Sequence, residues 1–379
     1  MLPVASLAVL LALGSAAPQL YDGDIVLPGI NEDRSKRGAP YMRATKWDKN
    51  ESIPYYFDSA INAATREVIK EGLASITSNT CLSFIENQNA AGTKAHSWLA
   101  GDVILCLERH SGRKNKMSLL DVDAKLKDRD QFVTVNFGSI IKDAAHNFDK
   151  LGESENENFG VPYDYGSNMH YGAFDFSSNN GQIIIPKDSA YTSTLGARRG
   201  PSFTDLELVN KLYKCGEQCP KVSCQNGGYQ HPKQCGRCAC SEFYTGTYCE
   251  RIVNVVSLQN GQSNTKVFEE KMNFGIVNNR VNPENYRKDP ITVFKAPEEK
   301  RVKITFNELS GFSNVGCGGC GAFNGIEIIE GPQLVTAGKM YCCNEDQGKI
   351  FYSNSNVIGY RAVVKPGFGY KHNITFSVL

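Results

Sequence analysis

The sequence predicts an α+β fold for its first part, followed by a small disulfide-rich module and an all-β sandwich. Three observations support this order. Residues 47–137 contain one long helical segment with an apolar stripe among several strand-like runs. Six cysteines fall within residues 219–249. Residues 252–379 alternate strand-like runs with Gly, Asn and Pro turns, as β-sandwiches do.

The charge balance excludes two classes of partner, and the cysteines indicate a compartment. Lys plus Arg number 41 and Asp plus Glu number 40, so neither nucleic acid nor an acidic membrane surface is expected as a partner. The chain carries 13 cysteines, most of them after Cys215, which is typical of an oxidising extracellular setting. We therefore expect extracellular protein substrates or ligands.

The first residues predict secretion. Residues 2–13 are nearly all apolar and too short to span a bilayer, and a run of small residues, GSAA, follows them. This pattern predicts a signal peptide over residues 1–16, with cleavage after Ala16. No other stretch competes as a membrane span, so we expect a secreted chain without an anchor.

The next part of the chain combines strands with two helices. Residues 53–57 predict a strand, and the stripe through Ile61, Val68, Leu73 and Ile76 predicts a helix of roughly five turns. Further strands are predicted at residues 81–84, 103–107 and 132–137, and a closing helix carries Leu206, Val209, Leu212 and Tyr213 on its apolar face.

Residues 162–171, PYDYGSNMHY, form a turn rich in Tyr, Gly, Ser, Met and His. A Met under such a turn can be ordinary core, because Met fills irregular gaps. The order of Ser167, Met169, His170 and Tyr171 nevertheless resembles the Met-turn of the astacin family (peptidase M12A), which are secreted zinc endopeptidases of the metzincin type. The resemblance implies that Met169 packs beneath a zinc ion and that Tyr171 is an additional, movable zinc ligand.

The resemblance covers residues 47–215 and predicts a peptidase domain over residues 38–215. It continues through FDFS at 174–177, IIIP at 183–186 and FTD at 203–205. In astacins the first and last cysteines of this domain pair, which implies a disulfide between Cys81 and Cys215.

Residues 17–37 resemble an astacin propeptide, with a solvated linker as the plain alternative. The string YDGD ending at Asp24 matches a family motif whose Asp caps the zinc and holds the zymogen inactive. The string RSKR ending at Arg37 resembles a furin-type processing site, which makes Gly38 the expected mature N-terminus.

The zinc-binding motif of the family is missing. Astacins carry HExxHxxGxxH, because one helical turn places two His on one face, the Glu acts as general base, and a Gly lets a third His close the site. The six histidines here include no two that are four residues apart, and Ser118-Leu119 runs almost directly into Lys127-Asp128-Arg129-Asp130. We expect no catalytic residue in this sequence, and we expect it not to bind the zinc that its family implies. His110, His170, Tyr171 and Asp121 or Asp123 are ligand types without a fixed geometry.

The cysteine count fits the same loss. In astacins the second cysteine of the domain, here Cys106, bonds to one that lies just before the zinc helix. That partner is missing with the helix, and the total of 13 is odd. Cys106 is therefore predicted to be a free thiol.

The remaining cysteines belong to two C-terminal modules. Residues 219–250 resemble an EGF-like module, which implies the pairs Cys219–Cys235, Cys224–Cys238 and Cys240–Cys249; a zinc knuckle is the alternative, disfavoured in a secreted chain. No acidic pattern precedes Cys219, so no Ca²⁺ is expected there.

Residues 252–379 resemble, by order and size, the CUB domain that follows the EGF-like module in many astacins, a nematode-type layout. Cys317, Cys320, Cys342 and Cys343 are expected to form two disulfides of open connectivity. Asn50 and Asn373 begin glycosylation sequons.

These observations predict a secreted astacin-family homologue that is inactive as written. Two alternatives stay open. A fuller transcript containing the missing helix would encode an active extracellular zinc endopeptidase. Alternatively, the chain is an extracellular binding protein that acts through its EGF-like and CUB-like modules.

Overall fold

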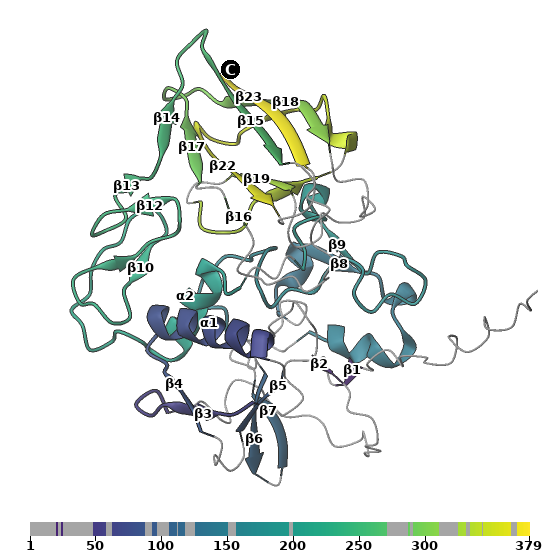
Figure 1. The fold of residues 1–379 in the computed structure, drawn as a ribbon, viewed down its shortest axis with the longest axis vertical. Helices are drawn as coiled ribbons and strands as arrows, with labels where there is room; N and C mark the ends of the chain where they lie inside the picture. The colour runs from purple at the N-terminus through teal and green to yellow at the C-terminus, as the bar shows by residue number, and fades with distance from the viewer. Residues whose placement is uncertain are drawn as a thin grey trace, which may run out of the picture.

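The computed structural model describes residues 20–21, 24–25, 48–57, 63–87, 93–96, 106–111, 113–117, 126–150, 157–196, 200–270, 287–288, 291–310, 325–330, 334–342, 344–364 and 370–379. Figure 1 shows an α+β part, a small module at its side and a β-sandwich above both. The predicted fold class is confirmed, with the bounds of single elements corrected below.

The first half of the α+β domain is built around helix α1 (Ala63–Asn79). Strands β3 (Ile53–Tyr55) and β4 (Phe84–Glu86) pair in parallel, with α1 as the crossover between them. Ile69 and Leu73 are buried on the apolar stripe of α1. The helix runs one turn beyond the stripe that predicts it and ends before Thr80, whose hydroxyl donates to the carbonyl of Ile76.

A second helix closes this half. Helix α2 (Phe203–Leu212) places Val209 against the same core, and the Cys81–Cys215 disulfide ties the end of α2 to the end of α1. Strands β5 (Thr93–His96), β6 (Cys106–Ser111) and β7 (Arg113–Met117) form an antiparallel sheet, and β1 (Leu20–Tyr21) pairs with β2 (Asp24–Ile25). The strand predicted at 103–107 corresponds to β6, which extends further, to Ser111; residues 103–105 lie outside the described part of the chain.

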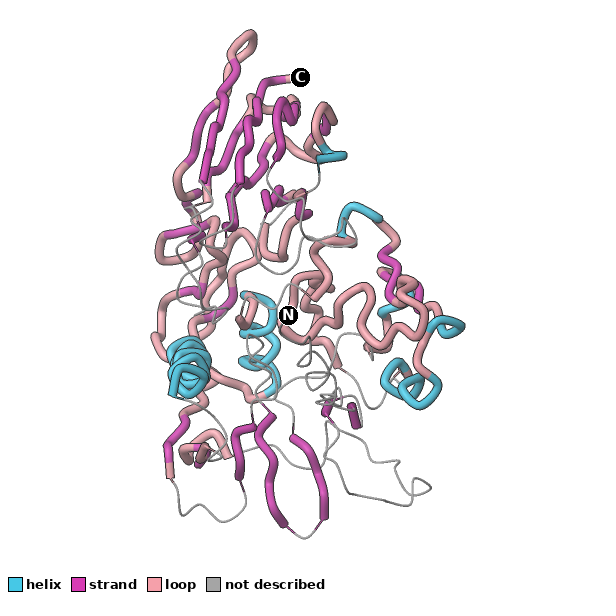
Figure 2. The backbone as a smooth tube through the Cα atoms, turned by 45° about the vertical axis from the view of Figure 1, so that its right-hand side comes forward, coloured by secondary structure: helices cyan, strands magenta, loops and turns pink. Residues whose placement is uncertain are grey.

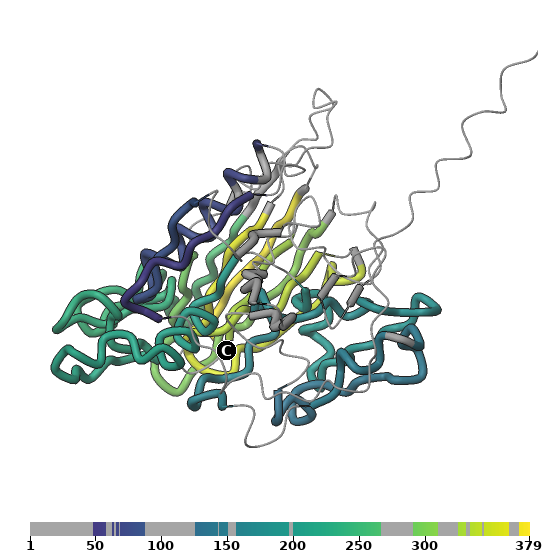
Figure 3. Tube along the Cα trace, turned by 90° about the horizontal axis from the view of Figure 1, so that it is seen from below, coloured from purple at the N-terminus to yellow at the C-terminus, as the bar shows by residue number. Residues whose placement is uncertain are grey.

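The second half of the domain has its own core. Strand β8 (Val133–Val135) pairs antiparallel with β9 (Ile184–Pro186). The strand predicted at 132–137 is shorter than expected because a 3₁₀ turn begins at Phe137. The 3₁₀ turns of this half are η3 (Arg129–Gln131), η4 (Phe137–Ser139), η5 (Lys142–Phe148) and η6 (Ser189–Tyr191). Helix α1 and residues 126–150 lie on opposite sides of the molecule in Figures 1 and 3.

The disulfide-rich module contains two short hairpins. Strand β10 (Tyr229–Gln230) pairs with β11 (Cys238–Ala239), and β12 (Tyr244–Thr245) pairs with β13 (Arg251–Ile252). Its disulfides are Cys219–Cys235, Cys224–Cys238 and Cys240–Cys249, the pairs that the EGF-like resemblance implies.

The last part is a sandwich of two sheets. One sheet has the order β14-β17-β22-β19-β20, with β16 also paired to β22, and the other has the order β15-β23-β18-β21. Their bounds are β14 (Val255–Ser257), β15 (Ser263–Glu270), β16 (Arg287–Lys288), β17 (Thr292–Lys295), β18 (Val302–Ser310), β19 (Gly325–Ile329), β20 (Lys339–Tyr341), β21 (Ile350–Tyr352), β22 (Val357–Val364) and β23 (Tyr370–Val378), with a 3₁₀ turn η8 (Asn344–Asp346). Phe294 and Ile326 from the first sheet share a buried core with Phe306 and Phe376 from the second.

Candidate functional site

The candidate site is the loop of residues 162–171, named the Met-turn loop from here on. It lies within the long irregular stretch between η5 and β9, of which residues 157–183 are described without a helix or strand; Figure 2 draws such segments as pink loop. An irregular segment can be buried only if its polar groups find partners. The partners of this loop come from helix α2, from its own neighbours and from the sandwich.

Asp205, at the start of α2, holds one side of the loop. Its carboxylate accepts hydrogen bonds from the Ser167 hydroxyl at 2.7 Å and from the backbone N–H of Asn168 at 3.0 Å. It also accepts from the backbone N–H of Ser202 at 2.9 Å, as part of a capping box in which the Ser202 hydroxyl accepts from the N–H of Asp205. One buried carboxylate thus caps the helix and fixes the loop.

Asp164 holds the other side. It accepts from the Thr204 hydroxyl at 2.7 Å and from the backbone N–H groups of Gly166 and Ala337, each at 3.0 Å. Burial raises the pKa of the Asp205 carboxyl, and the nearby negative charge of Asp164 raises it further. Each carboxylate accepts three hydrogen bonds, which offset the cost of burying the two like charges.

His170 has no ring nitrogen available for a metal. It is 1% exposed, its Nε2 lies 2.6 Å from the Tyr163 hydroxyl, and its Nδ1 lies 2.7 Å from the backbone oxygen of Tyr171. Nδ1 therefore carries the proton and donates to that carbonyl, and Nε2 accepts from Tyr163. Burial lowers the pKa of His170 to about 4, so the ring is neutral at pH 7.

Met169 and Tyr171 lie against different cores. Met169 packs on the cluster that contains Leu73 and Val209. Tyr171 is 5% exposed and belongs to the cluster of the other half, with its ring centroid 5.7 Å from that of Phe148. The loop therefore joins the two cores.

A small cavity of about 30 Å³ lies beneath the loop. It has room for water and is far smaller than the pockets that take drug-sized ligands. Its lining residues are Leu126, Asp128, Asn158, Val161, Pro162, Tyr163, Asp164, Ser167, Thr204, Asp205 and Leu208.

Among the described residues, no set of side chains is arranged to hold the zinc ion that the astacin family implies. Within the described ranges no group of three or more His, Cys, Asp or Glu side chains could hold a metal. His170 is occupied on both ring nitrogens. The other ligand types at His110, Asp121 and Asp123 have side chains outside the described part of the chain.

The remaining predicted site residues are placed only in part. Asp24 pairs with Tyr21 in the β1-β2 hairpin, and Arg37 and Gly38 lie outside the described residues. The backbone of Cys106 pairs with that of His96, and the Cys106 side chain is not described. Asn50 is exposed, with its side-chain amide donating to Asp48.

The sandwich residues among the predicted sites are also placed in part. Asn373 lies in β23, where its side-chain oxygen accepts from Asn307. Cys342 is disulfide-bonded, and its candidate partners Cys317, Cys320 and Cys343 lie outside the described residues. No helix among the described residues is long and apolar enough to cross a membrane.

The fold defines a class of modular protein: a disulfide-closed α+β domain joined to a disulfide-rich module and a β-sandwich. The sequence profile described as Astacin (Peptidase family M12A) matches residues 40–109 and 123–214, so this domain of the chain belongs to the astacin family. Residues 110–122 lie outside the match.

Relatives extend the similarity beyond this domain. Zinc metalloproteinase nas-31 of Caenorhabditis elegans is 28% identical over 385 residues, covering 89% of this chain and 60% of its own length. Zinc metalloproteinase nas-28 of the same organism is 26% identical over 375 residues, covering 91% of this chain and 73% of its own length. This chain thus spans less than two thirds of nas-31.

A solved structure aligns with part of the chain. High choriolytic enzyme 1, a hatching enzyme zinc-protease from Oryzias latipes, aligns with 45% of this chain and 98% of its own at 24% identity. The TM-score is 0.37.

Sequence reasoning missed the two carboxylates that hold the loop. The string Ser202-Phe203-Thr204-Asp205 before an apolar run is a capping-box signal that could have assigned Asp205. The contact between Asp164 and Ala337 has no such signal, because the acceptor meets a backbone N–H that is distant in sequence.

Proposed function

We propose that this chain, as written, is an extracellular member of the astacin family that does not hydrolyse peptide bonds and acts on other extracellular proteins by binding. The proposed organisation is a signal peptide at 1–16, a propeptide at 17–37, an astacin-type domain at 38–215, an EGF-like module at 219–250 and a CUB-like module at 252–379. Zinc, which the family implies, is not held by this chain.

One observation carries the proposal. The sequence lacks HExxHxxGxxH, while the stretches on both sides of its expected position match the family. Without that helix there is no general base and no set of three preorganised ligands. Two further facts support it: both ring nitrogens of His170 are engaged, and Met169 and Tyr171 pack on separate cores.

The first test measures zinc. The purified chain, cleaved after Arg37 and dialysed, should hold well under one zinc per molecule by atomic absorption. Stoichiometric zinc that is lost on His170→Ala or Tyr171→Phe would show a rebuilt site and contradict the proposal.

The second test measures cleavage of a quenched peptide library with and without chelator. The chain as written should cleave no peptide of the library. A form with a helix bearing HExxHxxGxxH inserted between Leu119 and Lys127 should cleave, and the same insert with Gln in place of its Glu is the matched control. Chelator-sensitive cleavage by the chain as written would refute inactivity. Absence of cleavage by the form with the inserted helix would mean that the scaffold has lost more than the helix.

A second candidate is an active zinc endopeptidase encoded by a longer transcript. The resumption of the family match at residue 123 favours it, because the flanks of the missing block are both present. Long-read sequencing of the transcript between Cys106 and Asp128 decides between the candidates. An added segment with the motif would assign the protease function to the full product.

A further inference from the structure

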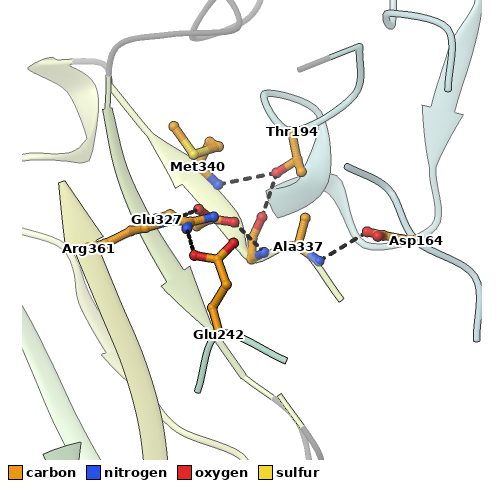
Figure 4. A network of polar contacts seen from close by, with 8 residues as sticks. Asp164, Thr194, Glu242, Glu327, Ala337, Met340 and Arg361 are labelled. Carbon is orange, nitrogen blue, oxygen red and sulfur yellow. Dashed lines mark hydrogen bonds and ion pairs between the residues drawn. The ribbon is translucent and has the colours of Figure 1, made fainter. Parts of the chain in front are cut away.

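The sandwich contacts the Met-turn loop directly through the segment of residues 334–341, which ends in β20. Figure 4 shows the polar contacts. The Thr194 hydroxyl, which is fully buried, donates to the backbone oxygen of Gly338 at 2.9 Å and accepts from the backbone N–H of Met340 at 3.3 Å. Asp164, within the Met-turn loop, accepts from the N–H of Ala337.

Close approach at this contact depends on a glycine of the loop. A Cβ added at Gly166 would lie 2.2 Å from the Cβ of Ala337, far inside contact distance. No larger residue fits without moving one of the two segments apart. The surface around Gly166, Asp164 and Thr194 therefore fits an extended backbone with a small side chain.

Charged groups at the edge of the contact between the sandwich and the α+β domain form ion pairs. Lys339 pairs with Glu330 of its own module at 2.9 Å and with Asp188 of the α+β domain at 3.1 Å, and it lies over the Tyr191 ring. Glu330 is largely buried and orients the ammonium group, while Asp188 is half exposed. The buried pair thus positions the cation, and the exposed pair crosses between the modules.

The EGF-like module contacts the sandwich in a parallel way. Phe243 and Tyr244 share an apolar core with Val293 and Leu334. Arg361 pairs with the fully buried Glu327 at 2.6 Å and with Glu242 of the EGF-like module at 2.7 Å.

The EGF-like module also contacts helix α2, which closes the ring of modules. The Asn210 side chain on α2 donates to the Tyr229 hydroxyl at 3.4 Å, and the Phe203 and Tyr229 rings lie 5.0 Å apart.

We propose that the segment 334–341 is an intramolecular brace: it docks on the Met-turn loop and makes the loop, the sandwich and the EGF-like module one mechanical unit. The loop is fixed by α2 on one side and by the sandwich on the other. This inference goes beyond the proposed function, because it holds for an inactive or an active chain.

The test is hydrogen exchange of the full chain in two segments, 162–171 and 334–342. Thr194→Val keeps the shape of the buried side chain and removes both bonds to the sandwich. Gly166→Ala forces the two segments apart from the other side. Each should speed exchange about tenfold or more in both segments, including residues 334–342, which carry neither substitution.

Matched controls separate docking from general loosening. Thr265→Val removes an exposed hydroxyl that contacts Thr375 within the sandwich, and Gly138→Ala adds a Cβ whose nearest neighbour is 3.5 Å away. Both should leave the two segments unchanged. Faster exchange confined to the substituted side, or equal to that of the controls, would overturn the brace.

A variant at the edge of the contact keeps the test decisive if the buried variants fail to fold. Asp188→Asn removes the cross-module ion pair, leaves Lys339 paired with Glu330, and keeps an oxygen to accept from the backbone N–H of Ala190. Added salt should speed exchange of residues 162–171 in the wild type and have little further effect in this variant, because salt screens half-exposed pairs. A wild-type loop that is insensitive to both salt and Asp188→Asn would also overturn the proposal.

Discussion

Asp205 is the side chain whose loss should loosen the Met-turn loop most directly. Asparagine matches its shape but offers one acceptor oxygen where the carboxylate serves three donors. With the amide oxygen toward the backbone N–H groups, the Ser167 hydroxyl loses its acceptor. In the opposite orientation, the amide NH₂ faces the N–H groups of Asn168 and Ser202.

Either orientation leaves at least one buried donor unsatisfied, which costs about 1–3 kcal/mol. Relief from burying a charge beside Asp164 offsets a part of this cost, so we expect Asp205→Asn to lower the free energy of unfolding by about 2 kcal/mol at pH 7. The difference should grow as the pH falls. The pKa of the Asp205 carboxyl is higher in the folded state than in the unfolded state, so the folded state binds this proton more readily. The stability gained from binding the proton is fully present below the unfolded pKa and is lost as the pH rises through the folded pKa.

Urea unfolding followed by tryptophan fluorescence is suited to this measurement. The two tryptophans, Trp47 and Trp98, both lie in the first domain, so the signal reports that domain in a multidomain chain. Asp48→Asn is the control, since Asp48 is exposed and its bonds to Asn50 need only one oxygen. If Asp205→Asn unfolds at the same urea concentration as the control, the carboxylate does not hold the loop.

Two further predictions concern His170 and Cys106. The folded pKa of His170 is about 4, below its ordinary 6.5, so its contribution to the free energy of unfolding should fall by about 3 kcal/mol as the pH drops from 6.5 to 4. In the same urea experiment, His170→Gln should make the free energy of unfolding less dependent on pH over this range. An unchanged pH dependence would contradict the assignment of a buried, neutral His170. Mass spectrometry of alkylated, unreduced protein should find Cys106 alkylated or in an intermolecular disulfide, and a disulfide from Cys106 to any of the other twelve cysteines would undo the inference that its partner is missing.

The sequence predicts well those features whose signal is local. The three disulfides of the small module are those implied by its resemblance to an EGF-like module, and the sandwich is predicted by alternating runs such as those that become β18 and β19. Element ends are less well predicted, because the Phe137 turn and the last turn of α1 are fixed by contacts outside the apolar pattern.

Contacts between modules were not predictable in the same way. Ala337 and Gly338 contribute backbone groups, and Thr194 is an ordinary residue type until the fold brings it beside them. Only Asp205 had a local signal in the sequence, which is the capping box. That signal predicts the start of helix α2, but it does not predict that the same carboxylate also binds the Met-turn loop.

The residues of the Met-turn loop stabilise the fold of this chain through contacts that do not involve zinc. Ser167 bonds to Asp205, His170 links Tyr163 to the backbone of Tyr171, and the Met and Tyr fill two separate cores. Replacing any of these residues would leave buried groups unpaired or a core underfilled, whether or not the chain ever binds a metal. Retention of the motif is therefore expected from folding alone, and it does not by itself indicate that catalysis was lost recently. Asp24 and the Arg37–Gly38 junction are different, since the roles implied for them concern activation. These positions, and not the Met-turn loop, are therefore the ones whose retention bears on whether this chain was recently a protease.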